Sequence, residues 1–128
     1  MRLLIDTHLL LWSLGAPERL PKDARALMEN DEHERCFSVV VIWEIAIKRA
    51  LDKPGFRTDP SLVRRALTDA GYTEIPVTSD HAIALLALPP LHRDPFDRIL
   101  VAQAHVEGAI LLTSDRAVAQ YPGGIRLV

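Results

Sequence analysis

The chain has 128 residues, of which 48% are hydrophobic and 25% are charged, so its composition is that of a globular protein and not of a disordered one. Fifteen Lys and Arg against 17 Asp and Glu give a formal net charge of −2, which excludes a globally basic nucleic-acid binder. The single cysteine, Cys36, excludes an internal disulfide bond, and the length fits one domain, 1–128. No apolar run approaches the roughly 18 residues of a membrane span, so we expect a cytoplasmic protein without a membrane partner.

Short apolar runs alternate with helix signals along the whole chain. In chain order, we expect a strand at 2–5, a helix at 7–14 capped by Thr7, a helix at 21–30, a strand at 35–38, a helix at 40–51 capped by Ser38, a helix at 60–70, a strand at 74–77, a helix at 79–88 capped by Ser79, a helix at 95–107, a strand at 109–113, a helix at 115–120 and a strand at 125–128. Strands that alternate with helices and consist of continuous apolar runs indicate a parallel sheet with both faces covered. The predicted fold is a three-layer α/β/α domain around a mostly parallel sheet of four or five strands.

Four acidic residues occupy unusual places in this layout. Asp6 follows the first strand and Asp115 follows the fourth, so both project from the carboxyl edge of the sheet. Asp97 lies one turn into the helix at 95–107, on the stripe that faces the core. Glu44 lies on the inward stripe of the helix at 40–51, again near the helix start. We therefore expect the four carboxylates to converge on one rim.

Each of these acids also has a local structural explanation when it is taken alone. The local roles are a helix N-cap for Asp6, an i,i+4 ion pair of Glu44 with Lys48, a capping box of Asp97 with Asp94, and an N-cap for Asp115. Together, however, four converging carboxylates repel one another and raise each other's pKa, unless a cation compensates them. Oxygen ligands without Cys or His favour Mg2+ or Mn2+, and such an ion suits the hydrolysis of a phosphodiester.

The order and spacing of four segments extend this interpretation. LLIDTHLLLW, SVVVIWEIAIK, RDPFDRILVAQA and LLTSD together resemble the PIN-domain ribonucleases, specifically the VapC-like toxins of bacterial type II toxin–antitoxin systems. The similarity spans essentially the whole chain. DPFDR followed by an apolar helix is fairly specific, and the four segments in sequence are a strong signal.

The resemblance implies a Mg2+- or Mn2+-dependent endoribonuclease that hydrolyses RNA and is neutralised by a cognate, VapB-like antitoxin. Carried over by motif, the catalytic and metal-binding acids fall on Asp6, Glu44, Asp97 and Asp115. The family often has hydroxyl groups near the first and fourth acids, which correspond here to Thr7 and Ser114. Asp94 is interpreted as the helix cap, and a homodimer is expected because the family commonly forms one.

Other side chains near the motifs are weaker candidates. Lys48, Arg93, Arg98 and Arg116 are candidate phosphate contacts, although a solvated surface charge explains each of them equally well. The five histidines lack zinc-site spacing, and Trp12 and Trp43 fit core or interface positions better than base-stacking ones. The principal alternative function is a catalytically silent PIN-like module that binds protein or RNA.

Overall fold

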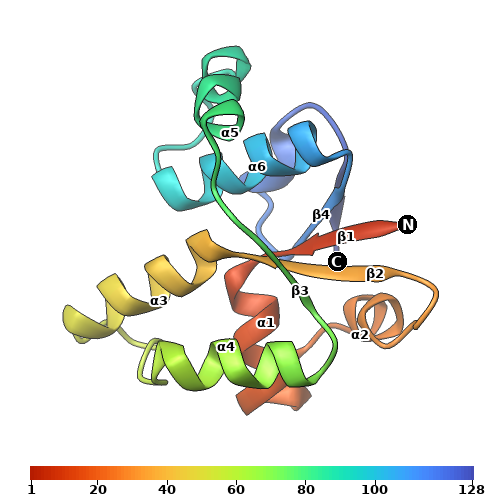
Figure 1. Cartoon of the computed structure of the whole chain (residues 1–128), viewed down its shortest axis with the longest axis vertical. Helices are drawn as coiled ribbons and strands as arrows, with labels where there is room; N and C mark the ends of the chain where they lie inside the picture. Colours follow the sequence, from red (N-terminus) through yellow and green to blue (C-terminus); the bar gives the residue numbers. More distant parts are fainter.

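Five parallel strands form the centre of the molecule in the computed structural model, which describes residues 1–128 (Figure 1). The strands are β1 (Arg2–Ile5), β2 (Glu34–Ser38), β3 (Thr73–Ile75), β4 (Ile110–Thr113) and β5 (Ile125–Leu127), and their order in the sheet is β3-β2-β1-β4-β5. β1 pairs with β2 and β4, and its residues Leu3, Leu4 and Ile5 are completely buried. Such continuous burial explains why the strand is an uninterrupted apolar run.

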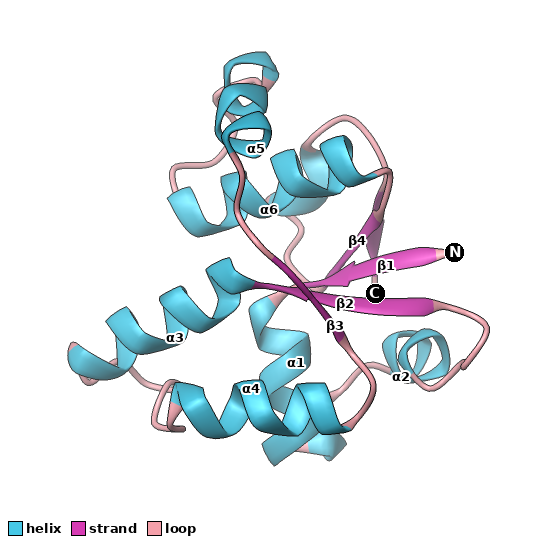
Figure 2. Ribbon diagram, viewed as in Figure 1, coloured by secondary structure: helices cyan, strands magenta, loops and turns pink.

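Helices cover the sheet on both faces, which confirms the predicted three-layer architecture (Figure 2). They are α1 (Thr7–Gly15), α2 (Lys22–Met28), α3 (Val39–Ala50), α4 (Pro60–Asp69), α5 (Ser79–Ala84) and α6 (Pro95–Glu107). α5 and α6 lie above the sheet in this view, whereas α1, α2 and α4 lie below it. α3 begins directly where β2 ends, so the chain enters this helix at the carboxyl edge of the sheet.

The caps of three helices bring their first turns to this edge. Asp6 caps α1 by accepting a hydrogen bond from the backbone N–H of Leu9, so the predicted cap at Thr7 is wrong by one residue. Ser38 caps α3 as predicted, and Asp94 caps α6. An N-cap residue satisfies one of the free N–H groups of the first turn.

Element boundaries differ from the predictions mainly in the second half of the chain. β3 ends at Ile75 and not at 77, since Pro76 has no N–H to continue a ladder. The following helix is capped by Thr78, not by Ser79, and gives way after Ala84 to a 3-10 turn at Leu85–Ala87. Only a 3-10 turn, Val118–Gln120, replaces the helix expected at 115–120. No helix has both the length and the apolar character required to cross a membrane.

Candidate metal centre

A cavity of about 170 Å³ opens at the carboxyl edge of the sheet, and none of the residues that line it is hydrophobic. Its lining comprises Asp6, Thr7, His8, Glu44, Lys48, His92, Asp94, Asp97, Ser114 and Asp115. The structure thus brings together all four acids expected at the site, as well as three of the residues expected to support them. The cavity also contains two histidines that the sequence did not assign to it.

Asp6 is held in a fixed orientation at the end of β1. Its side chain is almost completely buried; Oδ1 accepts from the Leu9 backbone at 3.0 Å, and Oδ2 accepts from the Thr113 hydroxyl at 2.6 Å. Burial raises the pKa of this carboxyl, and the hydrogen bonds oppose the rise only in part. Asp6 is therefore both a helix cap and a carboxylate whose charge is incompletely compensated by its neighbours.

Glu44 is buried at 3% exposure although it lies on a helix surface facing the cavity. The hydroxyl of Thr7 donates to Oε1, and the ammonium of Lys48 binds Oε2. The local i,i+4 ion pair therefore exists, but it lies inside the acidic cavity and not on an exposed helix face. Lys48 Nζ also lies 4.0 Å from Asp94 Oδ2, so this one ammonium serves two carboxylates.

Asp97 is a second carboxyl of the site with a raised pKa. Burial, and then the nearby charge of Asp94, raise its pKa to about 6, and Glu44 adds to the rise. His92 opposes it, because its Nε2 lies 2.9 Å from Asp97 Oδ2. One ligand atom from each of His92, Asp94 and Asp97 falls within 4.8 Å of the others.

Asp115 is exposed and joins the site through Thr113. Its backbone N–H donates to the Thr113 hydroxyl at 3.0 Å, and that same hydroxyl donates to Asp6. Its Oδ1 accepts from the backbone N–H of Ala117 at 2.9 Å, so Asp115 also stabilises the turn after β4. Thr113, which was not among the predicted site residues, therefore links the first and fourth acids. Ser114 lines the cavity beside them.

The donor set fits a hard divalent cation. Five carboxylates line the cavity, and the positive charge of Lys48 faces only two of them. Oxygen ligands of this kind suit Mg2+ or Mn2+, and one imidazole nitrogen is acceptable to Mn2+. A cation would relieve the repulsion that raises the pKa of Asp97.

His92 reaches the site from the loop before α6. Its backbone N–H donates to the hydroxyl of buried Tyr121 at 2.9 Å, and Arg98 donates to the same hydroxyl at 2.9 Å. No periodic pattern marks His92, and its position five residues before Asp97 was the only available signal. The second unassigned histidine, His8, is exposed at the start of α1.

Of the four candidate phosphate contacts, one lies at the acidic cavity. Lys48 lines the cavity, whereas Arg93, Arg98 and Arg116 do not. Arg98 instead donates to the carbonyl oxygen of Pro89 and to Tyr121, so its guanidinium has a structural role. Arg93 and Arg116 are exposed.

The cysteine and the two tryptophans differ in how far they are buried. Cys36 is buried, as expected for an inert thiol. Trp12 is partly buried, whereas Trp43 is 56% exposed and packs edge-on against Phe96 at 5.1 Å between ring centres.

Comparison with known proteins places this architecture in a family. A chain of VapBC2 from Rickettsia felis, solved bound to a DNA fragment from its promoter, is similar over 100% of this chain and 99% of its own, with 13% identity and a TM-score of 0.74. A chain of the DNA-bound VapBC from Salmonella typhimurium is similar over 100% and 97%, with 16% identity and a TM-score of 0.66. A toxin–antitoxin complex from Klebsiella pneumoniae gives 96% and 94%, 18% identity and a TM-score of 0.65.

At these identities the likeness concerns the fold. No curated protein sequence matches this chain. The PIN domain family, however, matches residues 3–124, which is nearly the whole sequence. The chain therefore belongs to the PIN domain family.

Proposed function

We propose that this protein is a VapC-like toxin that hydrolyses RNA phosphodiester bonds in a Mg2+- or Mn2+-dependent reaction. The observation that carries the proposal is the polar cavity in which Asp6, Glu44, Asp97 and Asp115 meet. The structural likeness to chains of VapBC complexes supports the toxin assignment. Carboxylates that are only partly compensated are suited to hold a divalent cation and unsuited to bind an anionic substrate without one.

Asp6, Glu44 and Asp97 would hold the cation, and Asp115 would complete the site from its exposed side. When bound, the cation polarises a phosphoryl oxygen and lowers the pKa of a bound water. Neighbouring groups orient these carboxylates by hydrogen bonds. Leu9 and Thr113 bind Asp6, Thr7 binds Glu44, and His92 binds Asp97. One of these carboxylates would also orient the attacking water by accepting a hydrogen bond from it.

The products would carry a 5′-phosphate and a 3′-hydroxyl. A VapB-like antitoxin would neutralise the enzyme by covering the cavity, and the protein would form a homodimer. These three features follow from the family likeness.

A catalytically silent binding module is the second candidate, and one contact favours it. Lys48 already neutralises part of the Glu44 charge and lies near Asp94, so an internal ammonium supplies some of the compensation that a metal ion would give. In such a module the carboxylates would receive a basic side chain from a partner.

Titration of the metal-free protein with Mn2+ separates the two functions. We expect saturable binding in the wild type and its loss in Asp6→Asn, which keeps an oxygen for the Leu9 cap. Asp31→Asn is the matched control, because Asp31 is exposed and far along the chain from every acid of the cavity. Isothermal titration calorimetry measures this binding. The same heat of Mn2+ binding in wild type and Asp6→Asn would exclude the metal site and favour the binding module.

A further inference from the structure

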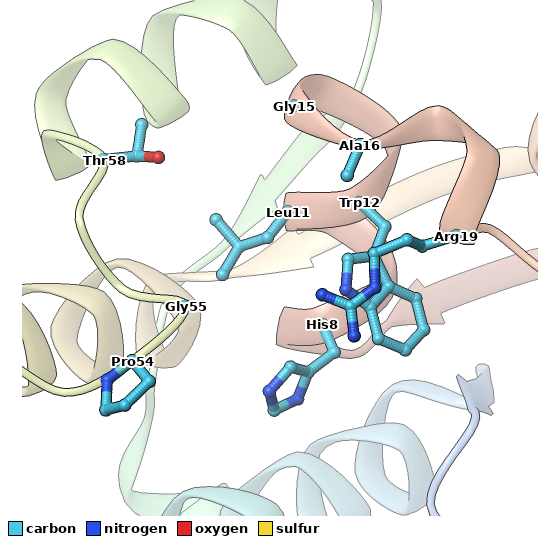
Figure 3. Close-up of a pocket in the computed structure, with 9 residues that line it drawn as sticks. All are labelled: His8, Leu11, Trp12, Gly15, Ala16, Arg19, Pro54, Gly55 and Thr58. Carbon is cyan, nitrogen blue, oxygen red and sulfur yellow. The ribbon is translucent and has the colours of Figure 1, made fainter.

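A second pocket, of about 530 Å³, adjoins the acidic cavity along α1. It lies between α1 with the turn that follows it and the loop that connects α3 to α4. Figure 3 shows His8, Trp12 and Arg19 on one side, Pro54 and Gly55 on the other, and Leu11 between them. Its volume is within the range of about 300–1,000 Å³ that is typical of small-molecule sites.

The wall formed by α1 has flat groups suited to stacking. The guanidinium carbon of Arg19 lies 5.2 Å from the centre of the Trp12 ring, and the His8 ring lies 5.8 Å from the same ring. Aromatic rings and arginine guanidinium planes are the surfaces on which proteins stack unpaired bases. The opposite wall adds a proline ring, and Gly55 has no side chain to fill the space.

His8 connects this pocket with the acidic cavity, because it lines both of them. It follows Thr7, whose hydroxyl binds Glu44, and its ring lies 5.6 Å from that of Phe56. A nucleotide with its phosphate at the acids would therefore have the second pocket beside it, on the side of His8.

The charges around the pocket favour a nucleotide as the occupant. No acidic residue lines it, and Arg19 forms no ion pair in the structure. The loop that forms the opposite wall, 51–59, has Lys53 and Arg57 against Asp52 and Asp59, so the positive charge of the pocket comes from Arg19. This unpaired guanidinium would attract a flanking phosphate of an RNA strand.

We propose that the pocket of His8, Trp12 and Arg19 is a subsite for a nucleobase of the RNA strand, next to the phosphodiester bond that is cleaved. The inference rests on the proposed function, since it assigns the neighbouring nucleotide of that substrate. His8 and Arg19 would stack with the base, and the guanidinium and the indole N–H would offer donors to its edge. The pocket would thereby select which nucleotides enter the cleavage site.

Tryptophan fluorescence tests the subsite directly. The chain has two tryptophans, so Trp43→Phe leaves Trp12 as the only reporter. The probes are the four ribonucleoside 5′-monophosphates in MgCl2, which have no diester to cleave, and ribose 5-phosphate, which lacks a base. We expect saturable quenching by at least one nucleotide and none by ribose 5-phosphate.

Two exposed side chains provide the variants. His8→Ala and Arg19→Ala in the Trp43→Phe protein should each weaken the best nucleotide about 5- to 150-fold, the effect of losing one stacking partner. Arg126→Ala, on the edge strand β5, is the control and should leave the affinity unchanged. Identical quenching by nucleotide and ribose 5-phosphate, or unchanged affinity in both variants, would overturn the subsite; an antitoxin segment would then be the better occupant.

A cleavage assay keeps this result separate from the proposed function. On an RNA that the wild type cleaves, Arg19→Ala should raise KM by a similar factor and change kcat less. Nucleotide quenching without any metal-dependent RNA cleavage would support the base pocket and refute the ribonuclease. Cleavage with an unchanged KM in Arg19→Ala would refute the subsite and leave the ribonuclease standing.

Discussion

Replacing Asp97 with Asn should stabilise the metal-free protein although it destroys the proposed activity. Burial and the charge of Asp94 raise the pKa of Asp97 from 3.8 to about 6, which means that the folded state disfavours its charge. A shift of this size corresponds to about 3 kcal/mol at most, at ~1.36 kcal/mol per pKa unit. The side chain is 20% exposed and gains from the α6 dipole, so we expect about 1–2 kcal/mol of added stability in Asp97→Asn.

The pH dependence of this gain has a definite sign. Above pH 6 Asp97 is ionised in both the folded and the unfolded chain, and the full penalty applies. As the pH falls through 6 towards 3.8, the folded protein binds a proton that the unfolded chain does not, so the stability of the wild type rises relative to that of the variant. Below pH 3.8 both states are protonated and the gain of Asp97→Asn disappears.

Urea unfolding at pH 7.5 and pH 4, in buffer with a chelator, measures this difference. Adding Mn2+ at pH 7.5 should reverse the order, because a cation at 100 times its Kd stabilises the wild type by about 2.7 kcal/mol and finds no complete site in the variant. Asp31→Asn serves again as the control and should follow the wild type. A variant that is less stable than the wild type without metal, or a difference independent of pH, would refute the reasoning.

Three further substitutions test how the site is held. Thr113→Val removes the hydroxyl shared by Asp6 and the Asp115 backbone, so urea unfolding should show a free energy of unfolding lower by about 1–3 kcal/mol. Thr73→Val, at an exposed strand position, is the control and should leave that free energy nearly unchanged. Tyr121→Phe frees the His92 loop and Arg98, and we expect slower RNA cleavage with about 1 kcal/mol lower stability; unchanged kinetics would show that the loop needs no such anchor. Lys48→Met removes the ammonium that occupies Glu44, so calorimetry should find tighter Mn2+ binding, and weaker binding would contradict the electrostatic account.

The chain order of strands and helices could be predicted because each strand is a continuous apolar run between helix signals. Leu3 to Ile5 and Leu111 to Leu112 are buried on both faces, and such runs are visible without a structure. The convergence of the acids followed from the same prediction, because parallel strands place their carboxyl ends at one edge.

Contacts between distant segments could not be predicted in this way. The Thr113 hydroxyl binds Asp6, which lies 107 positions earlier in the chain, and no sequence pattern at either residue indicates this contact. Tyr121 holds His92 from 29 positions away, so the role of this histidine appears only when the loop before α6 is folded. Caps were also misplaced by one residue at Thr7 and Ser79, because adjacent Asp and Thr residues compete for the same position.

The most direct test of the account is RNA cleavage by the purified, metal-stripped protein before and after Mn2+ or Mg2+ is added. We predict no cleavage without metal, cleavage with metal that leaves 5′-phosphate ends, and none with metal in Asp6→Asn. Cleavage in the presence of a chelator, or equal cleavage by wild type and Asp6→Asn, would contradict the central claim that these carboxylates form a metal-dependent ribonuclease site.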